Sequence, residues 1–243
     1  MALTVKVPEA AKERVDKARA MSTTEDALDE ILTVAIEQNG RAPAAHFPRL
    51  FEYPWTLEYI SRIKNVKTAA DIGAGVSPLP LALAKRGIDV YTFDASEMVR
   101  TWEQAKDWQA WGFLDYGVKC PKIKSFNKYF SADLVPGMKY DAIYSVSVVE
   151  HTPKSARVSI WNEAAKTLSD DGRLVFTIDI VPNTNRIWNH SLGRIVEAPE
   201  IHGKISDVHQ ELRDAGFVVE YQEILRGIPM SRVDLLFFTA KRA

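Results

Sequence analysis

The sequence predicts an α/β protein with a doubly wound, mostly parallel sheet of seven strands and an N-terminal helical appendage. Three observations lead to this prediction. Strand-like and helix-like segments alternate from residue 68 onwards, a glycine turn joins the first strand to a helix, and residues 1–66 show helical periodicity without strand alternation. We therefore expect a helical segment at 1–66 that packs on the core, and a main domain at 67–243.

The composition is that of an ordinary folded chain. With 243 residues, 46% of them hydrophobic, it can bury a sizeable core. A net charge of −1 creates no global field that would attract nucleic acid or an anionic membrane, so we expect neither as a partner. The single cysteine, Cys120, and the lack of a signal-like or long apolar run predict a cytoplasmic protein. No His and Cys spacing indicates a metal site.

The appendage begins with two predicted helices. The first runs from Pro8 to about Ala20. Ser22 and Glu25 have the spacing of a capping box and predict the start of the second helix, which Gly40 ends.

A third helix is expected from Pro54, because proline suits the first helical position. Trp55 belongs to an aromatic stripe of that helix, which is typical of a core-facing side. Glu52 and Tyr53 come just before the predicted start and are the better candidates for contacting a ligand.

The central feature is the turn after a buried strand at 68–72. Gly73 and Gly75 lack Cβ atoms, so the backbone can turn tightly and approach a ligand at the carboxyl end of the strand. Ser77 is placed as an N-cap, and Pro78 suits the first helical position. We expect a helix from there to Gly87.

Asp94 follows a second strand at 89–93, roughly 20 residues after the glycine turn. This is the spacing at which a nucleotide-binding βαβ unit places its ribose carboxylate. The alternative is that two glycines and an aspartate form only a turn and a helix cap.

Two segments follow before the next buried strand. Ser96 is expected to cap a helix with apolar residues at helical spacing, including Met98, Val99 and Trp102, that ends before Gly112. The stretch 119–129 interleaves lysines with aromatic residues, which could indicate a nucleic-acid strip, but a solvated edge strand explains it without a partner.

The remaining chain continues the alternation. We expect strands at 141–147, 174–178, 217–225 and 234–241, and helices at about 155–168 and 206–215. The segment 181–204 lacks clear periodicity.

Three stretches together resemble class I S-adenosylmethionine-dependent methyltransferases in order and spacing. They are Ala70-Asp71-Ile72-Gly73-Ala74-Gly75, Val90-Tyr91-Thr92-Phe93-Asp94-Ala95-Ser96 and Lys139-Tyr140-Asp141-Ala142-Ile143-Tyr144-Ser145-Val146-Ser147-Val148-Val149-Glu150-His151. The resemblance covers about residues 68–241. It implies a Rossmann-like methyltransferase fold and makes 67–243 the S-adenosylmethionine-binding catalytic domain.

The resemblance also implies cofactor contacts. Asp71 and the glycine turn would line the methionine end, Asp94 would accept both ribose hydroxyls, and Asp133 would meet the adenine amino group beside the Leu134 backbone. The expected cofactor-binding residues are Tyr53, Asp71, Gly73, Ala74, Gly75, Asp94, Ala95, Asp133, Leu134, Ser145 and Val146.

Two other functions remain open at the level of sequence. A nicotinamide-dependent oxidoreductase would also use the two glycines and Asp94, but Pro78 stands where the dinucleotide fingerprint has its third glycine. A catalytically silent cofactor-binding protein is the other alternative.

His151 is the candidate catalytic residue, because it follows the strand end expected beneath the methyl group. Methyl transfer to a hydroxyl needs a base, and a histidine with its ordinary pKa of about 6.5 suits that task. We therefore favour an O-methyltransferase that acts on a small molecule. A structural histidine that caps the next helix is the alternative.

The segment 181–204 is the candidate substrate lid, because it is long for a simple crossover. The candidate substrate residues are Trp188, His190, Arg194, His202, Arg226 and Arg232. Their arginines favour an anionic acceptor, although surface arginines are common. The sequence determines neither the acceptor, nor methylation at O, N or C, nor the oligomeric state. It also leaves open whether the N-terminal helices cover the substrate or mediate dimerisation.

Overall fold

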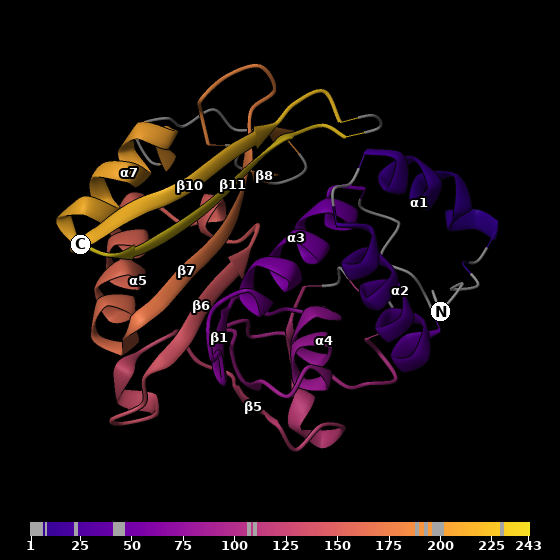
Figure 1. Ribbon diagram of the computed structural model, residues 1–243, viewed down its shortest axis with the longest axis horizontal. Coiled ribbons are helices and arrows are strands. Elements are labelled where there is room, and N and C mark those ends of the chain that lie inside the picture. The colour runs from indigo at the N-terminus through magenta and orange to yellow at the C-terminus, as the bar shows by residue number, and fades with distance from the viewer. Residues whose placement is uncertain are drawn as a thin grey trace. The chain divides into compact units, whose positions relative to one another are not determined.

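The computed structural model describes residues 7, 9–21, 24–40, 47–105, 108, 111–187, 190–191, 194–195, 202–228 and 231–243 (Figure 1). The chain divides into two compact units, Met1–Tyr129 and Phe130–Ala243. The expected boundary between a helical segment and a main domain at residues 66 and 67 stays a prediction.

The first unit contains the N-terminal helices, the glycine turn and three strands of the main sheet. Its elements are α1 (Glu9–Met21), α2 (Glu25–Asn39), α3 (Arg49–Ser61), β1 (Thr68–Ile72), α4 (Leu79–Lys85), β2 (Asp89–Phe93), β3 (Val99–Arg100), β4 (Phe113–Leu114), the 3₁₀ turn η1 (Tyr116–Val118) and β5 (Ile123–Phe126).

Helices α2 and α3 pack against α4, the helix that follows the glycine turn, and α1 packs against α3. Arg86, just past the end of α4, pairs with Glu30 on α2 at 2.6 Å between Nη2 and Oε2. Lys85, in the last turn of α4, pairs with Glu37, which also lies on α2. Cations at this end also suit the negative end of the helix dipole.

The three strands that the first unit contributes to the main sheet run parallel, in the order β1, β2, β5. Ile72 pairs with Phe93, so β1 and β2 end at the same level. The Gly73 N–H then donates to the Phe93 carbonyl at 2.7 Å. This register brings the glycine turn and Asp94 together. The predicted edge strand is confirmed as β5, which stands at the end of the strand order.

The second unit contains the other four strands of the main sheet and, among its described residues, the helices α5 and α7. Its elements are the 3₁₀ turn η2 (Ala132–Leu134), β6 (Tyr140–Val146), the 3₁₀ turn η3 (Val149–His151), α5 (Lys154–Thr167), β7 (Leu168–Ile180), β8 (His190–Ser191), β9 (Arg194–Ile195), α7 (Ile205–Asp214), β10 (Phe217–Leu225) and β11 (Asp234–Arg242).

In this unit β6 and β7 are parallel, and β11 lies antiparallel to both β7 and β10. Trp161 on α5 meets Phe176 edge-on at 5.0 Å between ring centroids, and Phe176 stacks on Phe238 at 5.7 Å. In Figure 1, α5 and α7 lie beside each other against these strands, and the two helices are in contact. The α/β fold with a seven-stranded, mostly parallel sheet is confirmed.

The helix expected after Ser96 is wrong. The described residues form the short parallel pair of β3 and β4 instead, and no helix occurs among the described residues from 96 to 112. Met98 and Val99 are 51% and 59% exposed. Their helical spacing therefore does not correspond to a buried face.

Helix starts in the N-terminal segment also differ from the prediction. α3 begins at Arg49, so Pro54 lies inside it and Glu52 and Tyr53 belong to it. Both side chains are buried, and Glu52 pairs with Arg49 at 2.6 Å. The capping box is not confirmed, because the N-cap of α2 is Thr24 and makes no side-chain cap bond. Ser22 lies outside the described residues.

Candidate functional site

The glycine turn has the geometry that the sequence predicts. Gly73 has φ of 72° and Gly75 has φ of 50°, in the left-handed region that side chains disfavour. Asp71, near the end of β1, is 4% exposed. The turn therefore follows a buried carboxylate. Because Gly73 and Gly75 have no Cβ atoms, a ligand can approach the backbone of the turn closely.

Asp94 fastens this turn from the end of β2. Its Oδ2 accepts the Gly75 N–H at 2.8 Å, and its Oδ1 accepts the Ser96 N–H at 2.9 Å. A carboxylate oxygen has two lone pairs, so each oxygen can still accept another donor. Asp94 is half-buried, and Ala95 beside it is half-buried as well.

Tyr116 holds the other side of the turn, a role that sequence reasoning missed. Its hydroxyl accepts the Ser77 N–H at 2.7 Å and donates to the Gly75 carbonyl at 2.9 Å. Burial raises the pKa of Tyr116 well above its ordinary value, so the hydroxyl keeps its proton. Ser77 Oγ accepts the Leu79 N–H at 3.1 Å, but the N-cap of α4 is Pro78, so the prediction of Ser77 as N-cap and Pro78 as first helical residue is wrong by one position.

Tyr53, on α3, contacts the end of the turn at Ser77. Its hydroxyl donates to the Trp108 carbonyl at 3.4 Å and also bonds to the Ser77 side chain. Burial raises the pKa of Tyr53 to about 12. Its expected contact with the cofactor stays a prediction.

In the second unit, buried polar groups gather where β6 and β7 end. Ser145 is buried, and Ser147 has a positive φ of 48°. The Ser147 hydroxyl donates to Asp179 Oδ1 at 3.0 Å, and its N–H donates to the Thr177 carbonyl at 3.2 Å. This turn directs the chain from β6 into η3.

The turn η3 carries His151 beside a buried carboxylate. Glu150 is fully buried, and its Oε1 accepts the Asp179 N–H at 3.3 Å. His151 Nε2 lies 4.0 Å from the same oxygen, and the His151 side chain is 25% exposed. The N-cap of α5 is Pro153, so the helix-cap alternative for His151 finds no support in the cap of α5.

Two buried side chains hold the backbone that follows Glu150. Arg157 donates to the Thr152 carbonyl at 3.1 Å and forms a two-pronged pair with Glu211 on α7. His202 bonds to the backbone of Glu150 and Thr152, and burial lowers its pKa. His202, expected to contact substrate, thus lies against η3.

The other predicted residues of this unit are placed as follows. Asp133 is exposed in η2, with Leu134 beside it, and Val146 ends β6. Arg226 pairs with Asp234 at 2.9 Å.

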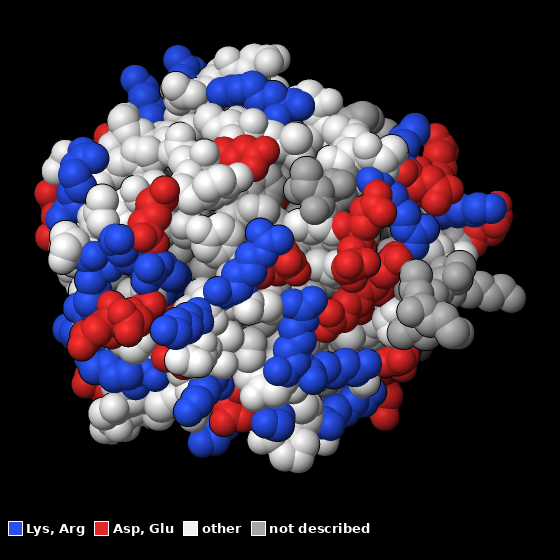
Figure 2. Space-filling view, viewed as in Figure 1, with Lys and Arg blue, Asp and Glu red and all other residues white. Residues whose placement is uncertain are grey.

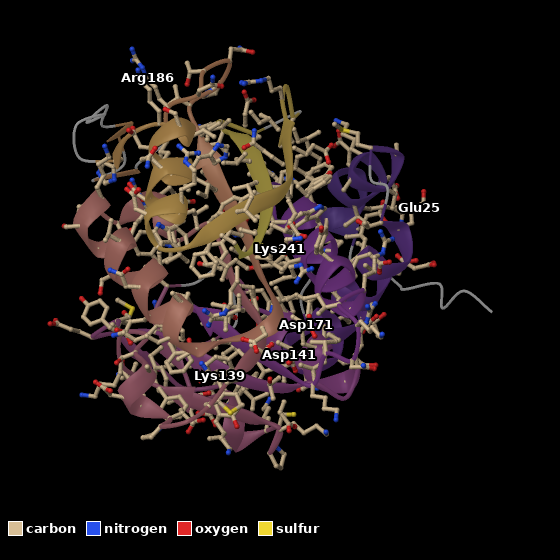
Figure 3. The ribbon with its side chains drawn as sticks, turned by 60° about the vertical axis from the view of Figure 1, so that its left-hand side comes forward. Glu25, Lys139, Asp141, Asp171, Arg186 and Lys241 are labelled. Carbon is tan, nitrogen blue, oxygen red and sulfur yellow. The ribbon has the colours of Figure 1, made fainter. Side chains whose placement is uncertain are left out.

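The predicted substrate segment is described only in part. Arg232 is exposed, and Arg186 extends from the segment after β7 (Figure 3). Trp188 and the side chains of His190 and Arg194 lie outside what the structure describes.

Other features of the described residues bear on partners. On the face shown in Figure 2, Lys and Arg side chains are interspersed with Asp and Glu side chains. Within the described part of the chain, no group of three or more His, Cys, Asp or Glu residues is arranged to hold a metal ion. No described helix is long and apolar enough to cross a membrane.

Fold and glycine turn together define a protein of the Rossmann-like α/β class. A family model described as a methyltransferase domain matches residues 41–222, and the chain belongs to this family. The resemblance to class I S-adenosylmethionine-dependent methyltransferases is thereby confirmed. A comparison with curated proteins gives no match.

Solved structures share the fold. The Burkholderia thailandensis 1,6-didemethyltoxoflavin-N1-methyltransferase, bound to 1,6-didemethyltoxoflavin and S-adenosylhomocysteine, has a TM-score of 0.58 and 14% identity over 79% of this chain and 78% of that chain. A glycopeptide N-methyltransferase complexed with S-adenosylmethionine has a TM-score of 0.54 and 13% identity, covering 79% and 94%. The magnesium protoporphyrin IX methyltransferase from Synechocystis PCC 6803 has a TM-score of 0.50 and 17% identity, covering 89% and 84%.

Proposed function

We propose that the protein transfers a methyl group from S-adenosylmethionine to a hydroxyl group of a small molecule, with His151 as general base. The observation that carries the proposal is His151 Nε2 at 4.0 Å from the buried Glu150 carboxylate, just after β6. A carboxylate beside an imidazole favours the protonated form that arises when the histidine takes a proton.

The residues of the first unit fit this cofactor. A ribose diol presents two O–H donors, and both oxygens of the half-buried Asp94 retain a lone pair after accepting their backbone N–H groups. The positive φ values of Gly73 and Gly75 let the backbone lie close to a ligand. Bound S-adenosylmethionine supplies an activated methyl group on a sulfonium, which is a good leaving group.

Further cofactor contacts are part of the same proposal. We assign Asp71, Ala74 and Ala95 to the surroundings of the methionine and ribose portions in the first unit. In the second unit, Ser145 and Val146 are assigned to the methionine portion, and Asp133 with Leu134 to the adenine. The relatives described above that were crystallised with S-adenosylmethionine or S-adenosylhomocysteine support this choice of cofactor.

N-methylation is the second candidate, because two of the three solved structures named above are N-methyltransferases. A nitrogen that arrives unprotonated needs no base, so His151 would then have no catalytic role. The nicotinamide oxidoreductase has no support from the family match. The idea of an anionic acceptor is weakened, because Arg226 already pairs with Asp234.

A label-transfer assay tests the proposal. The protein is incubated with S-adenosylmethionine labelled in the methyl group, together with panels of small hydroxyl and amine compounds. We expect label in hydroxyl compounds, at a rate that rises with pH as a base loses its proton. Transfer to amines alone would contradict the hydroxyl acceptor, and cofactor binding without any transfer would favour the catalytically silent alternative.

A further inference from the structure

No backbone N–H of residues 77–80, where α4 starts, is left free to bind a ligand. Pro78 and Pro80 have no N–H. The Ser77 N–H is bonded to the Tyr116 hydroxyl at 2.7 Å, and the Leu79 N–H is bonded to Ser77 Oγ at 3.1 Å. In dinucleotide-binding proteins, N–H groups at this place of the fold face the pyrophosphate.

Both the N–H and the carbonyl of Gly75 form hydrogen bonds with side chains. Its N–H donates to Asp94 Oδ2 at 2.8 Å, and its carbonyl accepts from Tyr116 at 2.9 Å. The hydroxyl of Tyr116 thus bridges Gly75 and Ser77 across the turn.

Tyr116 is itself fixed. Its side chain is fully buried, its ring meets that of Trp102 edge-on at 5.8 Å between centroids, and its N–H donates to Ser125 Oγ at 3.0 Å. A rigidly placed donor and acceptor loses little freedom when it holds a turn. The turn is therefore held in its shape before any ligand binds.

We infer that Tyr116 is a positioning residue for the cofactor: it holds the glycine turn in its ligand-binding shape and, with the two prolines, closes the start of α4 to phosphate groups. The inference rests on the proposed S-adenosylmethionine function. A sulfonium cofactor carries no pyrophosphate, so its binding does not need the N–H groups at the start of α4. A dinucleotide would find no free backbone N–H at residues 77–80.

The variant Tyr116→Phe removes only the hydroxyl. Loss of hydrogen bonds that position the turn should raise the Kd for S-adenosylhomocysteine by about 5- to 30-fold, measured by calorimetric titration. Tyr91→Phe is the matched control, because Tyr91 is also buried in the first unit and its hydroxyl accepts a long bond of 3.4 Å from Lys124. The control should keep its Kd within about twofold.

The outcomes separate this inference from the proposed function. If wild type binds S-adenosylhomocysteine and Tyr116→Phe binds it equally well while melting lower, Tyr116 is only structural and the inference is overturned. If wild type does not bind it, the proposed function itself fails. Strong displacement of S-adenosylhomocysteine from wild type by inorganic pyrophosphate would overturn the closure of α4.

Amide exchange on wild type gives a test that needs no variant to fold. The Ser77 amide of the ligand-free protein should exchange slowly with deuterium, because its partner is a buried hydroxyl. Exchange as fast as in an unstructured peptide would overturn the inference even if Tyr116→Phe fails to fold.

Discussion

His151→Ala is expected to lower turnover by about 10² to 10⁴-fold, which is the usual contribution of a positioned general base. Affinity for S-adenosylmethionine should stay nearly unchanged, because the role of His151 is to take the acceptor's proton. The buried Glu150 carboxylate, 4.0 Å from Nε2, would stabilise the imidazolium that forms. The measurement is kcat and KM for both substrates, using an acceptor identified by label transfer.

The pH profile separates a base from a structural histidine. Turnover of wild type should fall as pH drops, because a protonated imidazole cannot accept a proton. This acidic limb of the pH–rate profile should be absent in His151→Ala. His209→Ala is the matched control, since His209 lies on α7 of the same unit and should leave the limb in place. Full turnover per folded molecule in His151→Ala would remove it from catalysis.

Asp94→Ala is expected to weaken S-adenosylhomocysteine binding by about 10- to 150-fold, or about 1.5–3 kcal/mol, because hydrogen bonds to a charged group are lost. The bonds from Asp94 to Gly75 and Ser96 are lost as well, so the turn is also less well held. Calorimetric titration measures the affinity, and circular dichroism checks that the chain still folds.

Asp89→Ala is the matched control for this variant. Asp89 starts the same strand, is exposed, and makes a surface pair with Lys122 at 3.6 Å. Such pairs contribute little, so affinity should stay within about twofold. If Asp94→Ala also keeps its affinity, Asp94 is not the ribose carboxylate.

The glycine turn and its strands could be predicted because local chemistry determines them. Gly73 and Gly75 are glycines at positions of positive φ, and the strand before them is a buried run. The last two strands followed in the same way from apolar patterning. Each of these signals lies within a few residues of the structure that it specifies.

The segment after Asp94 was predicted wrongly because a tertiary contact overrides its periodicity. The Phe113 N–H donates to the Met98 carbonyl at 2.8 Å, and β3 pairs with β4 over Val99–Arg100 and Phe113–Leu114. These bonds commit the backbone to an extended pairing. Helical spacing of apolar residues predicts a helix only where that face is buried.

Other parts of the candidate site depend on contacts between distant residues. Tyr116 reaches Gly75 across 41 positions, and Ser147 reaches Asp179 across 32. Nothing in the neighbouring sequence of Tyr116 or Asp179 marks it as a partner of these turns. The parallel pairing of β6 with β7 had to be known before Asp179 could be placed beside Ser147.

Thermal unfolding with candidate cofactors tests the account most directly. At about 100 times its Kd, a ligand stabilises the folded chain by about 2.7 kcal/mol. For a chain of this size, S-adenosylmethionine or S-adenosylhomocysteine should therefore raise Tm by about 5–10 °C. NAD and NADP should leave it unchanged, because Ser77–Pro80 offers no free N–H to a pyrophosphate. An unchanged Tm with both sulfur ligands, or a rise with NAD alone, would contradict the account.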